Sequence, residues 1–189
     1  MRKLFLLIAT MTIITSCISA PTAKTENYYT LQPIQSTPIT TKNISIGLMP
    51  VDIPSYLDKP QIIVQSNNST IFQINEKERW IERFGKLVDR TVTNDLYSYI
   101  PNALISNPLI DEENSEYNVS IQINKIGGAL NNTLSLEAVY TIQNNKTSKT
   151  IQKRVMLNEK TGPTYIDYAD TISKLINEMV KQIATEIVK

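Results

Sequence analysis

The sequence predicts an α+β fold, a mixed, largely antiparallel sheet with two long amphipathic helices packed on it as a two-layer sandwich. Three observations predict this class. Residues 117–157 alternate apolar and polar side chains, as antiparallel strands with one buried face do. Residues 76–99 and 167–189 repeat apolar side chains at steps of three and four, the spacing of helices with one buried face. Shorter β-rich segments before residue 75 supply additional strands.

The start of the chain has the pattern of a bacterial lipoprotein signal. Residues 1–3 include Arg and Lys, residues 4–14 are largely apolar, and Ile-Thr-Ser directly precedes Cys17. In such signals the Cys thiol receives a diacylglycerol and the peptide before it is removed, with acyl chains such as palmitate forming the anchor. The apolar run is too short for a membrane-spanning helix, which needs about 20 residues. We therefore predict that residues 1–16 are a signal peptide and that Cys17 is lipidated; a soluble secreted protein with a chance Cys is the alternative.

Residues 17–27 are interpreted as the acylated Cys followed by a flexible tether, because no hydrophobic periodicity occurs after Cys17 until residue 28. Ten extended residues reach about 33–36 Å, so the folded part is expected to stay near its membrane. Residues 28–189 have the length of a single domain. The whole chain is 41% hydrophobic and its single Cys is Cys17, so the domain is expected to be stabilised by core burial without an intramolecular disulfide.

The first part of the domain is expected to be mainly β. Strands are predicted at residues 28–31 and 43–49, and residues 61–65 and 70–74 are predicted to form a hairpin around an Asn-containing turn. Residues 50–60 contain three prolines, which fix φ and restrict the preceding residues, so we expect a stiff, non-helical loop there.

This proline-rich loop carries more apolar side chains than most loops. Ile53, Tyr56 and Leu57 have two interpretations: packing beneath the loop, or contact with a binding partner. An aromatic residue beside aliphatic ones on a stiff segment is a common composition of interface hot spots. Ile53, Tyr56 and Leu57 are therefore the candidate partner-binding residues.

The first helix is expected over residues 76–99, before Pro101, with Trp80 as a core residue on its apolar face. A separate short turn over residues 76–80 is the alternative for its start. A short strand at residues 103–105 follows, and then an acidic loop over residues 107–116. This loop lacks the alternating oxygen ligands and the Gly of a calcium-binding loop, so a solvated loop is expected rather than a Ca²⁺ site.

The turns of the β meander are expected at residues 127–132 and 144–146. Gly127-Gly128 lacks the spacing and the following helix of a phosphate-binding loop and is interpreted as a turn. The last helix is expected over residues 167–189 with Asp167 as its N-cap. Its polar face is mixed rather than basic, so we expect it to pack on the sheet and not to lie on lipid.

The composition argues against several functional classes. The chain has no His, and its single Cys is assigned to the anchor, which removes Cys–His and Ser–His–Asp nucleophile systems and the usual zinc ligands. We therefore expect no enzyme activity, no catalytic residue, no metal site and no cofactor; a cell-wall hydrolase is the catalytic alternative. The 19 basic and 18 acidic residues form no basic patch, which argues against nucleic acid as a partner.

Four segments carry a resemblance to a known family: Tyr-Tyr-Thr-Leu at 28–31, Val-Asp-Ile-Pro-Ser-Tyr-Leu-Asp-Lys-Pro-Gln-Ile-Ile at 51–63, Arg79-Trp80, and Tyr168-Ala169. In these segments the chain resembles the ABC-type transport auxiliary lipoprotein family (PqiC-like). The segment from Ile53 to Ile63 is the most specific of the four. Lys59 stands where the family often has Arg, and Ile81 stands where a small residue is usual.

The resemblance implies a periplasmic lipoprotein that acts as the docking component of an MCE-type lipid transport system. In such systems an MCE-domain protein works with an ABC permease and ATPase. Ile18 after the acylated Cys, instead of Asp, implies the outer membrane under the enterobacterial sorting rule, with the inner membrane as the alternative. A structural lipoprotein of another envelope assembly complex is the alternative function, and homo-oligomer formation stays open.

Overall fold

The computed structural model describes residues 25–67, 70–107 and 115–189. In chain order the elements are β1 (Asn27–Tyr29), β2 (Ile44–Leu48), β3 (Gln61–Gln65), β4 (Phe72–Trp80), α2 (Phe84–Tyr99), β5 (Ala103–Ser106), β6 (Tyr117–Gly128), β7 (Thr133–Asn144), β8 (Lys149–Lys160) and α3 (Tyr165–Val188). Each strand and helix expected from the sequence has a counterpart, with the differences described below.

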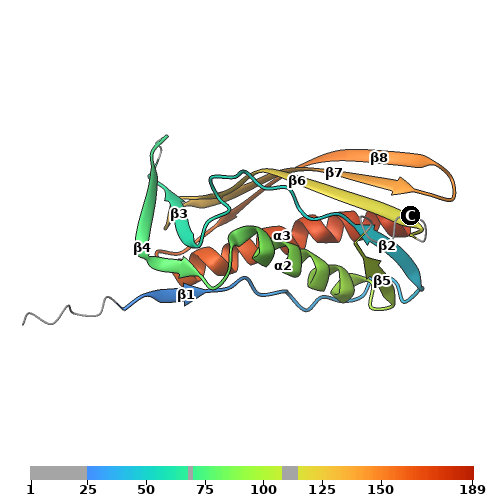
Figure 1. Ribbon diagram of the computed structural model, residues 1–189, viewed down its shortest axis with the longest axis horizontal. Helices are drawn as coiled ribbons and strands as arrows, with labels where there is room; N and C mark the ends of the chain where they lie inside the picture. The colour runs from blue at the N-terminus through green and yellow to red at the C-terminus, as the bar shows by residue number, and fades with distance from the viewer. Residues whose placement is uncertain (1–24, 68–69, 108–114) are drawn as a thin grey trace, which may run out of the picture.

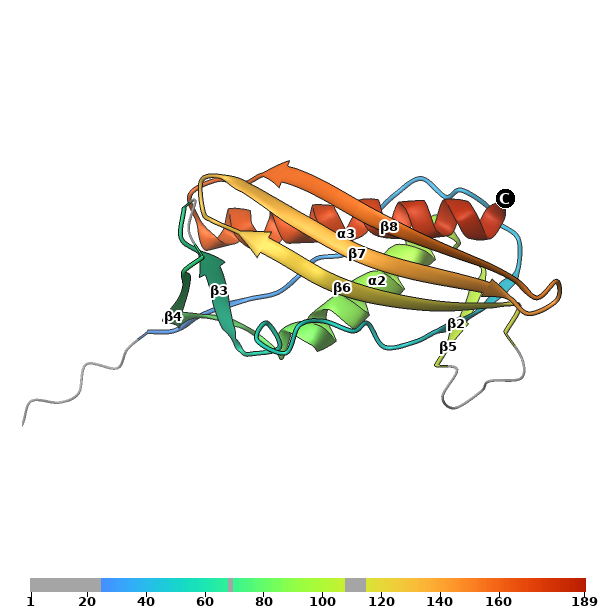
Figure 2. The ribbon, with the colours of Figure 1, turned by 90° about the horizontal axis from the view of Figure 1, so that it is seen from above.

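Two sheets and two helices make up the architecture. The larger sheet has the order β5-β2-β6-β7-β8, and α2 and α3 lie beneath it as the second layer (Figures 1 and 2). The smaller sheet, of order β1-β4-β3, stands at one end of the molecule, where the chain enters the domain (Figure 1). Both sheets combine parallel and antiparallel pairs. The expected α+β class is confirmed, with the strands divided between two sheets.

The predicted meander is the main part of the larger sheet. β6 pairs antiparallel with β7, and β7 with β8, while β2 lies parallel to both β5 and β6. Alternate residues of β7 are buried: Leu134, Leu136, Ala138, Tyr140 and Ile142. This period of two directs one face of the sheet to the helices. Gly127 and Gly128 pair with β7 at the end of β6, so the turn predicted there is confined to residues 129–132.

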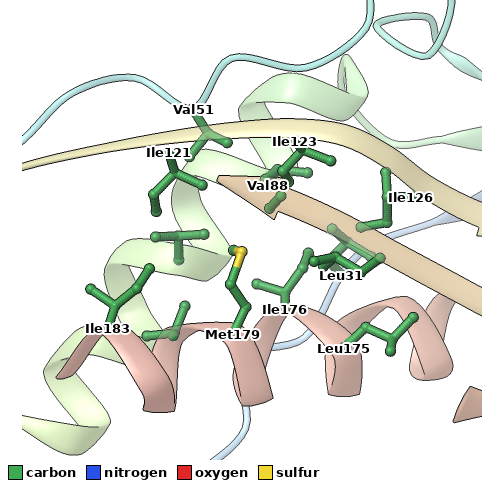
Figure 3. Packing of buried hydrophobic residues seen from close by; sticks show 14 of the residues in the cluster. Leu31, Val51, Val88, Ile121, Ile123, Ile126, Leu175, Ile176, Met179 and Ile183 are labelled. Atoms are coloured by element: carbon green, nitrogen blue, oxygen red, sulfur yellow. The ribbon is translucent and has the colours of Figure 1, made fainter. Parts of the chain in front are cut away.

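The core lies between α3, α2 and the inner face of the larger sheet. In Figure 3, Ile176 and Met179 of α3 point toward Ile121 and Ile123 of β6, with Val88 of α2 beside them. All five side chains are buried. The apolar stripe predicted for the last helix is therefore its core face, and the helix packs on the sheet as expected.

The start of α3 differs from the prediction, because Thr164 and not Asp167 is the N-cap. The amide of Asp167 donates to Thr164 Oγ1 at 3.1 Å, and the amide of Thr164 donates to the Asp167 carboxylate at 3.0 Å. Asp167 is thus the N3 residue of a capping box, in which the two residues satisfy each other's free N–H groups.

The start of the first helix also differs from the prediction. Residues 76–80 belong to β4, and α2 begins only at Phe84. Tyr29 pairs with Trp80 in parallel register, and the amide of Trp80 donates to the carbonyl oxygen of Pro60 at 2.6 Å, so strand partners hold this segment on both sides. Trp80 is buried, with 4% of its surface exposed, and its ring stacks on Phe84 with the centroids 5.1 Å apart. These two rings are four residues apart, the spacing of a helical repeat, although Trp80 ends a strand and Phe84 begins a helix.

Two predictions fall outside the described residues. One is the signal peptide of residues 1–16 with the lipidated Cys17, and the other is the acidic loop with Asp111, Glu112 and Glu113. Within the described ranges, no helix has the length and apolar character needed to cross a membrane.

Candidate partner-binding surface

The proline-rich loop is held at both ends by α2. The amide of Val51 donates to Asp89 Oδ1 at 2.7 Å. At the other end, Asp58 Oδ1 accepts a hydrogen bond from the amide of Gly85 at 3.1 Å, and Asp58 Oδ2 accepts one from Arg83 Nε at 3.0 Å. Arg83, the residue before the helix, makes no capping hydrogen bond with its own side chain. Asp58 therefore supplies a cap to α2 from a distant part of the chain.

The charge of Asp58 suits this position. Desolvation by burial opposes ionisation, but the hydrogen bonds from Arg83 and Gly85 and the charge of Arg83 hold the pKa of Asp58 below its ordinary value. An ionised carboxylate at the N-terminus of α2 also interacts favourably with the helix dipole. The loop is thus attached by charged hydrogen bonds in addition to apolar packing.

Exposure separates the three candidate residues of the loop. Leu57 is 7% exposed and belongs to the hydrophobic core. Ile53 is half-buried and packs against the same core. Tyr56 is 40% exposed. Of the three, Tyr56 offers the largest surface to a partner, whereas Leu57 fixes the loop to the core.

Tyr56 lies beside apolar residues of the β3–β4 hairpin that sequence reasoning did not select. Its ring is tilted against that of Phe72, with the centroids 5.4 Å apart. Phe72, Ile74 and Ile71 are 50%, 52% and 62% exposed. We call Tyr56, Phe72 and Ile74 the hairpin patch. Alternation at Phe72 and Ile74 indicates a strand with an apolar face, but periodicity does not tell whether another element covers that face.

A hollow opens next to the hairpin patch, between the hairpin and the end of β6. It includes a cavity of about 200 Å³ with apolar walls from Tyr56, Leu57, Ile63, Phe72, Ile126 and Tyr168. A more polar cavity of about 470 Å³ shares Gln65, Lys125, Gly127 and Gly128 with the first. The hairpin patch therefore adjoins a recess in which an apolar wall continues into a polar one.

Tyr168 and Gly127 fix the base of this hollow. The hydroxyl of Tyr168 donates to the carbonyl oxygen of Ile63 at 3.0 Å, which joins α3 to β3. Burial raises the pKa of Tyr168. Gly127 has a φ of 120°, and a Cβ on it would lie 2.4 Å from the Tyr168 hydroxyl oxygen. A side chain at position 127 is excluded both by the backbone conformation and by the space that Tyr168 occupies.

A buried acid on α2 serves the fold rather than this surface. Asp95 Oδ1 accepts a hydrogen bond from the amide of Ile34 at 2.9 Å, which attaches the segment between β1 and β2 to the helix. Burial raises the pKa of Asp95 to about 6, against the opposing effect of the Ile34 hydrogen bond and the polar Asn177 side chain. In the part of the chain that the structure describes, no group of three or more His, Cys, Asp or Glu residues is placed to hold a metal ion.

The fold and this surface define an α+β domain with exposed apolar residues at the end where the chain enters. Comparison with known families identifies it further. The chain belongs to the family described as ABC-type transport auxiliary lipoprotein component, whose profile matches residues 29–184. The family resemblance carried by residues 51–63 is thereby confirmed, and in this segment Val51 and Asp58 bond to α2 while Leu57 enters the core.

Two solved structures share the fold. The first, described as an uncharacterized protein, has a TM-score of 0.71 and 16% identity, over 86% of this chain and 99% of the other. The second, a protein from Xanthomonas campestris, has a TM-score of 0.64 and 9% identity, over 84% of this chain and 92% of the other. No curated relative matches this chain.

Proposed function

We propose that this protein is the lipid-anchored, periplasmic docking component of an MCE/ABC-type lipid transport system at the outer membrane. The family match over residues 29–184 is the observation that carries the proposal. Cys17, preceded by Ile-Thr-Ser, supplies the anchor, and Ile18 favours the outer membrane. The direct partner is an MCE-domain protein, and through it the system includes an ABC permease and ATPase. The role of this domain is non-catalytic: it holds the partner close to the membrane.

The hairpin patch is the docking surface that we assign to this role. Tyr56 and Phe72 form a partly exposed aromatic pair, a residue type enriched in interface hot spots. Asp58 and Asp89 fix the loop that carries Tyr56, so little conformational entropy is lost when a partner binds. The adjoining apolar cavity offers a recess for a side chain of the partner. Leu57 acts from within the core by supporting Tyr56.

Capture of the MCE-domain protein tests this proposal. The double variant Tyr56→Ser, Phe72→Ser removes both rings of the patch. Its matched control is Leu104→Ser, Met156→Ser, which removes side chains that are 71% and 60% exposed on β5 and β8. Both variants are expected to keep nearly the wild-type melting temperature, because all four side chains are substantially exposed.

We expect the wild-type lipoprotein and the control to co-purify with the MCE-domain protein of the same bacterium, and the patch variant to lose it. Equal capture by the patch variant and the control would refute the hairpin patch as the docking surface. Failure of the wild-type lipoprotein to capture that protein would refute the partner itself.

A further inference from the structure

A second group of exposed apolar residues surrounds the point where the chain enters the domain. Tyr28 of β1, Ile81 after β4 and Ile166 in the first turn of α3 are 56%, 56% and 63% exposed. The amide of Ile81 donates to the carbonyl oxygen of Tyr29 at 2.8 Å, and the rings of Tyr29 and Tyr165 have centroids 6.2 Å apart. We call these five residues the tether-exit cluster. Figure 1 shows β1, the end of β4 and the start of α3 together at one end of the molecule.

The composition of this cluster is that of a membrane interface. Its exposed members are Tyr28, Ile81 and Ile166, whereas Tyr29 and Tyr165 are half-buried and pack against the core. Tyr side chains are enriched where the hydrocarbon of a bilayer meets the headgroups. Two of the hydroxyls already have partners in the protein: Tyr28 donates to Glu26 at 2.6 Å, and Tyr29 donates to Glu78 at 2.5 Å. The Tyr28 ring can therefore enter a less polar layer with its hydroxyl hydrogen-bonded.

Two of the acids beside the cluster form ion pairs. Glu26 lies 3.7 Å from Arg79, and Glu82 forms an ion pair with Arg90. These pairs reduce the repulsion that free carboxylates would experience at an anionic lipid surface. The cluster thus combines exposed apolar side chains with two acids that have cationic partners, Glu26 and Glu82, and with Glu78, whose carboxylate accepts hydrogen bonds from Asn27 and Tyr29.

The length of the chain before the cluster limits its distance from the anchor. Thr25 follows Cys17 by eight residues. Fully extended, eight residues span at most about 26–29 Å. An anchored domain therefore keeps the tether-exit cluster at a high effective concentration at the bilayer, where a weak apolar contact suffices for docking.

We propose that the tether-exit cluster rests in the interfacial layer of the bilayer that holds the anchor, so that the domain docks on the membrane by this face. The inference rests on the acylation of Cys17 proposed above. It assigns separate surfaces to the two contacts, the tether-exit cluster for lipid and the hairpin patch for the protein partner.

Site-directed spin labelling of the full lipoprotein tests the contact with lipid. Acylation consumes the thiol of Cys17, so Ile166→Cys would supply the free thiol for a nitroxide label, and Leu104→Cys on β5 is the matched control. Each protein is reconstituted into vesicles of phosphatidylethanolamine and phosphatidylglycerol. We expect the label at 166 to be severalfold more accessible to oxygen than to an aqueous nickel complex, and the label at 104 to show the reverse.

The outcomes separate the anchor from the membrane contact. A lipoprotein that floats with the vesicles but has a fully aqueous label at 166 would overturn the membrane contact and leave the anchor intact. Labelling of two thiols per chain, without flotation, would overturn the acylation of Cys17 and with it this inference. Shielding at 166 that develops only after addition of the MCE-domain protein would assign the cluster to a protein partner and overturn the lipid contact.

In a second measurement, Ile81→Ser is added to the Ile166→Cys protein. We expect flotation to persist, because the acyl chains remain, while nickel accessibility at 166 rises severalfold. Unchanged accessibility would contradict a role for the cluster as a unit.

Discussion

The buried carboxylate of Asp95 predicts a pH dependence of stability that one substitution should remove. Asp95 is 0% exposed, and its Oδ2 has no hydrogen-bond partner among the described residues. Burial raises its pKa from 3.8 to about 6. Because the folded state then binds the proton more tightly than the unfolded state, Asp95 contributes stability that is complete below about pH 3.8. This contribution is lost as the pH rises through about 6.

The size of the effect follows from the difference in pKa. About two pKa units correspond to about 3 kcal/mol in the free energy of unfolding. In Asp95→Asn the amide oxygen can still accept the hydrogen bond from Ile34, but no charge forms. We therefore expect the variant to be more stable than the wild type by up to about 3 kcal/mol near pH 7.5, and the two proteins to differ little near pH 4.

Urea unfolding followed by circular dichroism, at pH values from about 4 to 7.5, measures this difference on the domain made without residues 1–24. Other carboxylates also have shifted pKa values: burial raises the pKa of Asp89, while hydrogen bonds lower the pKa values of Asp58 and Asp167. These groups are common to both proteins, so the difference between the two curves isolates Asp95. Parallel pH profiles for the wild type and Asp95→Asn would refute the reasoning.

Three further predictions concern packing and the anchor. Trp80→Ala should lower the free energy of unfolding by roughly 3–5 kcal/mol, because a large buried ring is lost; a decrease below about 1 kcal/mol in urea unfolding would contradict its place in the core. Gly127→Ala should lower the melting temperature, since strain at a positive φ alone costs about 1–3 kcal/mol. Tyr168→Phe removes the hydroxyl that a Cβ at position 127 would overlap, so it should lower stability less in the Gly127→Ala protein than in the wild type. If the effects of the two substitutions on stability are simply additive, the overlap is refuted. Cys17→Ser should abolish acyl labelling and the lipid mass of the full-length protein, and acylation that persists would exclude Cys17 as the anchor.

Much of the fold could be predicted because its periodic segments are long. The alternation along Tyr117–Gly128 and Thr133–Asn144 and the apolar stripe of Tyr165–Val188 each extend over many residues, so a local irregularity does not change the interpretation. The assignment of residues 76–80 to a helix was wrong for two reasons. Trp80 and Phe84 are four residues apart, which matches a helical repeat, and the partners of the strand, Tyr29 and Pro60, are distant in the sequence. The spacing of apolar residues along the chain does not indicate strand partners that are distant in the sequence.

The candidate site could be predicted only in part for the same reason. Tyr56 was selected from the composition of its loop, and its exposure is consistent with that choice. Phe72 and Ile74 were assigned to a strand correctly, but their exposure depends on what the tertiary structure leaves uncovered. Leu57 has the same apolar character as Ile74 and yet is buried, so hydrophobicity by itself does not separate core from surface.

The cap that Asp58 provides to α2 limits how the loop can move. Asp58 is 27 residues from Gly85, so the hydrogen bond between them closes a long segment of chain onto the helix start. Any motion that lifts this end of the loop must break that bond and leave an amide of the first helical turn without its partner. In hydrogen-exchange terms, the amides of Gly85 and Val51 should open together as one cooperative unit, more slowly than those of a free loop. The loop cannot act as an independent lid, because releasing it begins to unwind the helix beneath it.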